Sequence, residues 1–257
     1  MDPHVQPAPI LQTRLPYDAD GLRPLPGIAP LAEAELILRD EAHAPQMALR
    51  DRLLADHRAA VTDLRPGALP AAQELLEEVL NLLCRDPGYV REGTRITRPD
   101  GTIVALDPTL PLITLGRLVQ QDFCLLEKPE GAAEHVLTGA VLCFPSSWTL
   151  AEKIGHPLVR IHRPVDSYDE NIAKRVQRLF DGVQTGRPLW RFNHLPYEDF
   201  RLFQPRREGA PIDPARARRE KMKYLRSERQ TLWRLPSSRA VVFGIHTFVL
   251  RRDAEQD

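Results

Sequence analysis

Two apolar runs, at 122–128 and 132–148, constrain the fold most, because only a short linker separates them. Each is too short for a long buried helix, and the second is bounded by a proline and serines, so both predict buried strands. The linker "PEGAAE" leaves room only for a reversal, so the strands pair antiparallel. A third apolar run, 240–250, predicts another strand, placed centrally in the same sheet.

Helical patterns precede and interrupt this sheet. Residues 70–85 form the clearest helix, because Pro70 suits a first turn and the leucines recur at helical spacing. Residues 31–60 show two short helical patterns broken near Pro45, and 172–183 has one apolar face. The sequence therefore predicts an α+β fold with a mostly antiparallel sheet, and no regular βαβ alternation.

Several other segments have simpler signatures. Residues 94–106 predict a hairpin, with two β-branched runs around Pro-Asp-Gly. The Pro-rich residues 1–30 are expected to run extended over a surface. Residues 201–220 are polar and contain prolines and arginines, which predicts a solvated loop, and 225–236 forms a charged run before the final strand.

Composition excludes several classes of protein. The 257 residues contain 35 Lys and Arg and 35 Asp and Glu, a balance that argues against a general nucleic-acid binder. The three cysteines form no CxxC pair, which disfavours a zinc site or a disulfide framework. No GxGxxG or GxxxxGK[ST] motif occurs. Without a signal peptide or a stretch of about 20 apolar residues, we expect a soluble cytoplasmic protein that needs no membrane.

His162 is the most interesting single residue, because it ends a short apolar run just before a proline. One interpretation is a structural histidine that hydrogen-bonds a neighbouring backbone group. The other is an axial ligand to haem iron, which needs only one protein imidazole and an apolar pocket. Four other histidines compete with it for that role: His135, His156, His194 and His246.

The polar residues within apolar segments also allow two interpretations, a structural role or a role in binding a ligand. Trp148, Glu152 and Lys153 surround a buried run, and 225–236 is rich in arginine. Buried arginines need anionic partners, because an unpaired buried charge is costly. The partners are either carboxylates of the protein itself or those of a ligand such as the haem propionates.

Five ordered motifs together give the chain a family resemblance, which extends upstream to "VQQDFCLLEK", "LRDEAHAPQMALRDRLL" and "GLRPL". The motifs are "CFPSSW", "EKIGHPLVRIHRPV", the arginine before "FN" in "WRFNHLP", "LRSERQTLWRLP" and "AVVFGIHTF". With these segments the chain resembles the haem-dependent oxidative N-demethylase family over most of its length.

This resemblance implies a PAS-like fold that binds haem b. It implies oxidation of a small secondary amine, such as dimethylamine, by dioxygen, giving a primary amine and formaldehyde. Electrons would arrive from a partner reductase subunit that carries flavin and iron–sulfur centres and uses NADPH. The implied organisation is an extended segment, 1–30, followed by one haem-binding domain, 31–257, whose first part is helical.

The resemblance also implies roles for individual residues. His162, in the Ile-His-x-Pro-Val motif with Pro164 and Val165, becomes the candidate axial ligand of the iron. The implied cofactor-binding residues are His162, Trp148, Lys153, Arg226 and Arg229. The implied catalytic residues are Arg226, Glu228, Arg229 and Gln230, without separate roles.

The chain departs from the family pattern at three positions. Asp166 stands where a second proline is frequent, His194 where a tryptophan is frequent, and Gln121 where a glutamate is frequent. If the tryptophan or the glutamate shapes the substrate site, the substrate differs here or amine oxidation is lost. The alternatives to an enzyme are a haem-binding sensor or carrier without turnover, and an interaction protein with a vestigial pocket.

Overall fold

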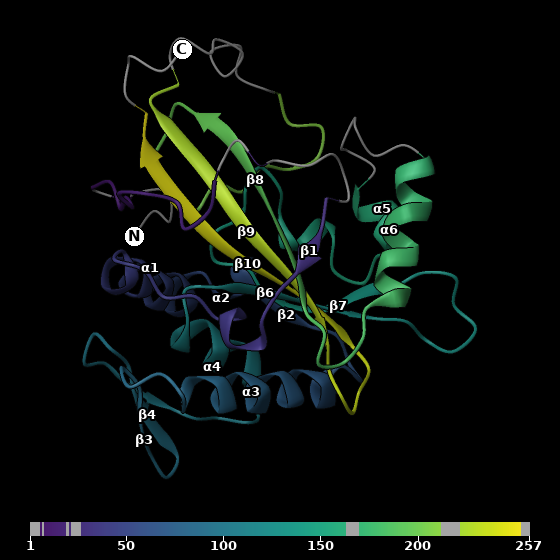
Figure 1. Ribbon diagram of the computed structural model, residues 1–257, viewed down its shortest axis with the longest axis horizontal. Coiled ribbons are helices and arrows are strands. Elements are labelled where there is room, and N and C mark those ends of the chain that lie inside the picture. The colour runs from purple at the N-terminus through teal and green to yellow at the C-terminus, as the bar shows by residue number, and fades with distance from the viewer. Residues whose placement is uncertain are drawn as a thin grey trace.

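The computed structural model describes residues 6, 8–18, 21, 27–162, 170–211 and 222–252. Within them a seven-stranded sheet has the order β1-β8-β9-β10-β6-β7-β2, and every neighbouring pair is antiparallel (Figure 1). The strands are β1 (Ala29–Pro30), β2 (Thr62–Leu64), β6 (Asp122–Glu127), β7 (Val136–Val141), β8 (Leu189–Tyr197), β9 (Tyr224–Arg234) and β10 (Val241–Arg251). The predicted α+β fold with a mostly antiparallel, PAS-like sheet is therefore confirmed, and β10 lies in the middle as expected.

A second sheet of three short strands holds the predicted hairpin. Its order is β3 (Val90–Glu92), β4 (Arg95–Thr97), β5 (Ile103–Ala105). The β4–β5 turn contains Gly101 at φ 81°, a left-handed conformation that glycine adopts without strain. Arg98, beside that turn, forms ion pairs with Asp51 and Asp100. The local turn signal in the sequence thus gave the correct structure.

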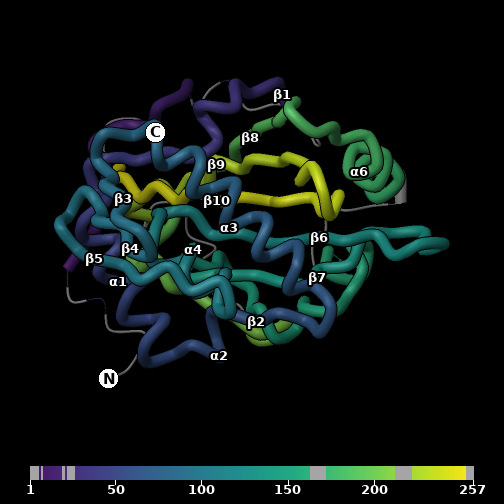
Figure 2. The backbone as a smooth tube through the Cα atoms, turned by 90° about the horizontal axis from the view of Figure 1, so that it is seen from below, coloured from purple at the N-terminus to yellow at the C-terminus, as the bar shows by residue number. Residues whose placement is uncertain are grey.

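The helices lie in two groups on either side of the large sheet (Figures 1 and 2). The first group is α1 (His43–Asp56), α2 (Arg58–Val61), α3 (Leu69–Leu83) and α4 (Pro111–Leu118). The second is α5 (Leu158–His162) and α6 (Glu170–Gly182), and two 3-10 turns, η2 (Glu33–Glu35) and η3 (Leu150–Glu152), complete the list. The N-terminal helical part that the sequence predicted is thus present.

Strand alternation divides the long strands between two environments. On the α5/α6 face, Leu232 and Ile245 join the apolar cluster that includes Leu158 and Phe180. On the α1/α4 face, Trp233 and Val242 join the larger cluster with α1, α3 and α4. The cross-strand register therefore places Arg226, Glu228 and Gln230 on the same face of β9 as Leu232, and it places Ser227, Arg229 and Thr231 on the same face as Trp233.

The charged run at 225–236 is itself a strand, which the sequence did not reveal. β9 pairs along its length with both β8 and β10. Its polar side chains project to both faces, so the apolar-polar alternation that normally marks a half-buried strand is absent. The break expected near Pro45 also differs, because α1 starts at His43 and holds Pro45 in its first turn, where proline is tolerated.

The described part of the N-terminal segment packs on the sheet. Gln12 exchanges hydrogen bonds with the backbone of Val249, both at 2.9 Å. Tyr17 stacks on Phe192 with ring centroids 4.5 Å apart, and its hydroxyl bonds to Ser227 at 2.8 Å. The proposed boundary between this segment and the domain stays a prediction.

Candidate functional site

His162 is the last residue of α5, on the α5/α6 side of the sheet. Its Nδ1–H donates to the Leu158 carbonyl at 2.9 Å, one helical turn earlier, so the ring is held in one tautomer with its lone pair on Nε2. Burial lowers the pKa of His162, which favours the neutral imidazole that binds metals. A backbone carbonyl behind Nδ1 is the usual support for a metal-ligating histidine.

The rest of the motif after His162 lies outside the described residues. Residues 163–169 include Pro164, Val165 and Asp166, so the structure gives no account of these three positions.

Lys153 connects the residues around His162. Its Nζ donates to the carbonyl of Ile161, the neighbour of His162, and lies 5.7 Å from the ring centroid of Trp148. It also lies 3.6 Å from Glu208, and burial lowers its pKa. Lys153 therefore contacts both Trp148 and the residue that precedes His162, and the roles predicted for these three residues stay predictions.

Partly buried apolar side chains lie on the same side of the sheet as His162. They pack against the cluster formed by the sheet, α5 and α6, and come from the β7–α5 connection, α5, α6, β8 and β10. They are Trp148, Ile161, Val176, Leu179, Leu189 and Phe243. A flat, apolar macrocycle needs an environment of this kind.

A polar row on β8 and β9 lies on the same face of the sheet. Glu228 accepts a hydrogen bond from Asn193 at 3.2 Å and another from Gln230 at 3.1 Å. Gln230 in turn accepts one from Arg191 at 2.8 Å. The row therefore presents one carboxylate and one guanidinium that are held in place by amides.

Arg191 is the member of this row whose charge is least compensated. Its Nε is buried without a hydrogen-bond partner among the described residues, and no described carboxylate lies within ion-pair distance. Burial lowers its pKa, and Glu228 only partly opposes that effect. A guanidinium in this state is suited to bind a carboxylate.

Arg226 lies on the same face but is occupied by the protein. Its Nη atoms donate to the carbonyls of Phe144 and Leu202 at 2.7 and 3.0 Å. Its Nε lies 3.8 Å from Glu228. Of the two interpretations left open for the arginines, the internal network describes Arg226 and the ligand interpretation suits Arg191.

Arg229 is not brought together with the other predicted site residues. It follows Glu228 by one position, so it projects to the α1/α4 face. There its Nη2 donates to the Glu35 carbonyl at 2.7 Å, and its guanidinium lies 5.7 Å from the ring centroid of Trp190.

The competing histidines also lie elsewhere or are engaged. His156 is exposed, and His135 interacts with Gln177 at 3.2 Å. His194 is paired with Ser227 on the α1/α4 face, and His246 is fully buried there against Asp40 at 2.9 Å. His162 alone among these five ends a helix on the apolar α5/α6 face within the described part of the chain.

The comparison with protein families agrees with this geometry. The model of the family described as haem-dependent oxidative N-demethylase, alpha subunit-like, matches residues 27–254. The chain belongs to this family. The description implies dependence on haem and an enzyme of more than one subunit, in which this chain is similar to the alpha subunit.

Two of the three departures from the N-demethylase pattern can now be located. His194 and Gln121 both lie on the α1/α4 side, where His194 stacks near Phe192 and Gln121 accepts a hydrogen bond from Leu38 N–H at 3.1 Å. They are therefore on the opposite side of the sheet from His162 and Glu228.

The residues on the α5/α6 face suit the haem of an N-demethylase. They combine an imidazole whose Nδ1–H is held by a backbone carbonyl, partly buried apolar side chains, and a guanidinium that has no carboxylate partner among the described residues. The part of the chain that the structure describes has no group of three or more His, Cys, Asp or Glu that could hold a metal ion directly. In the same ranges no helix has the length and apolar character needed to cross a bilayer.

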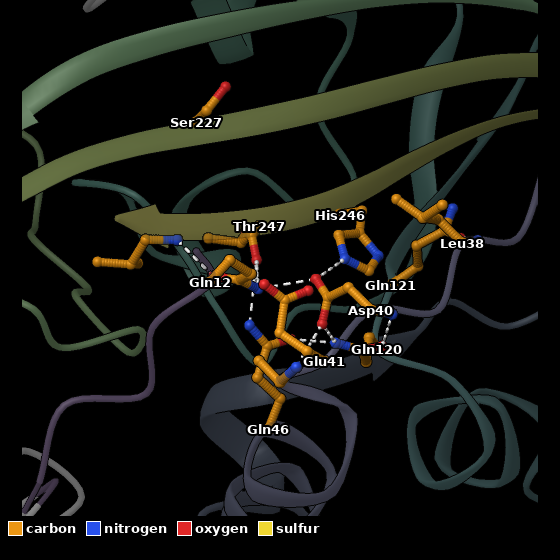
Figure 3. A network of polar contacts seen from close by, with 12 residues as sticks. Gln12, Leu38, Asp40, Glu41, Gln46, Gln120, Gln121, Ser227, His246 and Thr247 are labelled. Atoms are coloured by element: carbon orange, nitrogen blue, oxygen red, sulfur yellow. Dashed lines mark hydrogen bonds and ion pairs between the residues drawn. The ribbon is translucent and has the colours of Figure 1, made fainter. Parts of the chain in front are cut away.

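The sequence missed a further polar network on the α1/α4 side (Figure 3). Asp40 accepts hydrogen bonds from Gln12 at 2.8 Å and Gln120 at 2.7 Å, in addition to its contact with His246. Gln46 joins it through Gln120 at 3.0 Å. These residues come from distant parts of the chain, so no local spacing could have indicated their contact.

Proposed function

We propose that this chain is the haem b-binding subunit of an enzyme that oxidatively N-demethylates a small secondary amine, such as dimethylamine. The proposal rests chiefly on His162, whose Nδ1–H is fixed by the Leu158 carbonyl on the face that also carries the Glu228 row. Membership of the N-demethylase family supports it. Dioxygen is the oxidant, and a partner reductase with flavin and iron–sulfur centres supplies two electrons.

Each group of residues has a distinct task in binding the haem. His162 would hold the haem iron through Nε2, and the apolar side chains of α5, α6 and β10 would exclude water from the macrocycle. Arg191 pairs with a propionate carboxylate, which satisfies its orphaned Nε. Lys153 holds the Ile161 carbonyl and so positions the turn that carries His162.

The overall reaction balances with one dioxygen. A secondary amine, dioxygen, two protons and two electrons give a primary amine, formaldehyde and water. The bound haem supplies the activation of dioxygen and the oxidation of the N-methyl carbon.

Glu228 is the residue we propose to bind the amine. Its carboxylate is held by Asn193 and Gln230 and approached by Arg226, so its orientation is fixed before substrate arrives. A carboxylate forms a charge-assisted hydrogen bond with the N–H of an alkylammonium, and it can accept the proton that converts the bound ammonium to the free amine.

An absorption spectrum tests the whole proposal. The protein purified with haem available is expected to show a Soret band that shifts on reduction with dithionite and again when dimethylamine is added. A Soret band whose maximum does not shift when dimethylamine is added would instead indicate a sensor, a carrier or another substrate. The absence of any Soret band after reconstitution would overturn the haem proposal.

Glu228→Gln tests the amine-binding role separately from haem binding. We expect kcat/KM for the amine to fall by about 10- to 100-fold, because one charge-assisted hydrogen bond is lost, while the Soret band stays unchanged. Glu130→Gln, in the exposed β6–β7 loop, is the matched control and should retain full turnover. Equal turnover in both variants would remove Glu228 from the proposed site.

A further inference from the structure

The proposed iron ligand lies on a helix that is too short to be stable by itself. α5 has only five residues, Leu158–His162, and an isolated helix of fewer than about 12–15 residues is marginal in water. Contacts with the rest of the chain therefore set its direction. They also set the direction of the His162 ring, because the backbone of the same helical turn holds that ring.

The first turn of α5 is fixed by the connection that precedes β7. The Leu158 N–H donates to the His135 carbonyl at 3.1 Å, and the Val159 N–H donates to the Glu134 carboxylate at 2.9 Å. The Leu158 side chain is also buried in the apolar cluster on this side of the sheet. All three contacts act at the end of α5 that is opposite to His162.

Two cations act near the end that carries His162, and they share one carboxylate. Arg160 belongs to α5, and Lys153 donates to the Ile161 carbonyl. Arg160 Nη1 lies 3.2 Å from one carboxylate oxygen of Glu208 and 3.1 Å from the other. Lys153 Nζ lies 3.6 Å from the same carboxylate. Glu208 thus joins the two cations that contact or belong to this turn.

The segment that carries Glu208 is itself docked on the chain before α5. Its Gln204 carbonyl accepts a hydrogen bond from the Ser147 N–H at 3.0 Å, and the Glu208 N–H donates to the Glu152 carboxylate at 3.2 Å. The composition of residues 201–220 predicted a solvated loop, because composition gives no sign of these long-range contacts. Glu208 therefore reaches α5 from a fixed segment.

The charges around Glu208 form a balanced network and not an isolated surface pair. Two carboxylates, Glu152 and Glu208, face two cations, Lys153 and Arg160. The side chains of Lys153 and Glu208 are only 12% and 25% exposed. A network of several charges holds its members more firmly than a single exposed pair does.

We propose that Glu208 is a positioning residue for His162, acting through Arg160 and Lys153. The inference rests on the proposed function, because it assigns Glu208 a role in the haem site. With the carboxylate in place, α5 keeps one orientation and His162 Nε2 keeps one direction. Without it, the end of α5 that carries His162 gains freedom, and the histidine–iron bond weakens.

Glu208→Gln tests this role, because it removes the charge at nearly constant volume. In the full chain reconstituted with haem, the rate of haem transfer to excess apomyoglobin should rise about fivefold. The iron–histidine stretching frequency of the ferrous protein should shift, which a purely structural contact elsewhere would not cause. In the chain without haem, amide hydrogen exchange in residues 158–162 should accelerate about fivefold, while the urea midpoint stays at the wild-type value.

Three further variants make the test specific. Glu198→Gln, at an exposed position just after β8, is the control and should behave like the wild type. Glu208→Asp keeps the charge and should retain most of the wild-type haem affinity. Arg160→Gln should reproduce the effect of Glu208→Gln, and the double variant should lose no more than either single one, because the two residues act as one pair.

The outcomes separate this inference from the proposed function. If wild-type protein shows a Soret band but Glu208→Gln matches it in haem transfer and in stretching frequency, the role of Glu208 is excluded and the proposed function stands. A fall in the urea midpoint that accounts for the faster haem loss would also exclude positioning. The absence of a Soret band in the wild type would refute the proposed function and, with it, the role of Glu208.

Discussion

A His162→Ala variant is expected to lose the Soret band, or to retain a weak one with a shifted maximum. The reason is that His162 is the proposed axial ligand and its Nδ1–H is already fixed by the Leu158 carbonyl. Losing the ligand removes the bond to iron and leaves only apolar contacts and the Arg191–propionate pair. The measurement is the absorbance of matched wild-type and variant samples after reconstitution with equimolar haem, with thermal unfolding followed in parallel.

Two comparisons separate ligand loss from unfolding. His156→Ala removes an exposed imidazole in the nearby loop and should leave the Soret band intact. Free imidazole added to His162→Ala should restore part of the original spectrum, because it can enter the space left by the side chain. An unchanged spectrum in His162→Ala would exclude His162 as the ligand and return it to a structural role.

Local patterns in the sequence predicted the elements whose stability is local. The helix at 70–85, the 94–106 hairpin and the pair formed by β6 and β7 each have a period and a turn signal within one short segment. β9 could not be found in this way, because several of its polar side chains form hydrogen bonds with distant parts of the chain, on both faces of the sheet. Those contacts come from Glu35, Asn193 and Leu202, which are far from β9 in the sequence or on another strand.

The same distinction explains which site residues could be predicted. His162, Trp148 and Lys153 lie within one segment, and in the structure Lys153 contacts the Trp148 ring and the Ile161 carbonyl next to His162. Arg191 was noted only as part of a motif, and its contact with Gln230 depends on the β8–β9 register. The family resemblance implied one site for Glu228, Arg229 and Gln230, whereas strand alternation places Arg229 on the opposite face of β9 from the other two.

The two faces of β9 thus carry different chemistry. Glu228 and Gln230 project toward the apolar region around His162, whereas Arg229 and Thr231 project into the polar layer beneath residues 35–40. Both sets of side chains are therefore positioned by the backbone of one strand. Through the hydrogen bond from Arg229 to the Glu35 carbonyl, residues 35–40 contact the strand that also carries Glu228.

Arg50→Met is expected to lower the free energy of unfolding by about 3–5 kcal/mol, because it breaks a buried ion pair from one side. Arg50 Nη1 lies 2.6 Å from Asp122, and the two side chains are 0% and 1% exposed. Arg50 also donates to the carbonyls of Gly116, Gln120 and Gln121. Methionine fills the volume but leaves these acceptors and the carboxylate buried without their donor. Urea unfolding measures the effect.

Arg39→Met is the matched control, because Arg39 pairs with Asp86 at 3.0 Å while its side chain remains 41% exposed. An exposed pair contributes no more than about 1 kcal/mol, so this variant should unfold close to the wild-type urea concentration.

Asp122 also accepts hydrogen bonds from the backbone N–H groups of Cys143 and Phe144 at 2.8 Å, so the Arg50–Asp122 pair fixes the end of β7 and the start of the "CFPSSW" segment. That segment leads to Trp148, and Arg50→Met should therefore weaken haem retention as well as stability, whereas Arg39→Met should change neither. Equal unfolding midpoints for the two variants would contradict the assignment of a structural role to the Arg50–Asp122 pair.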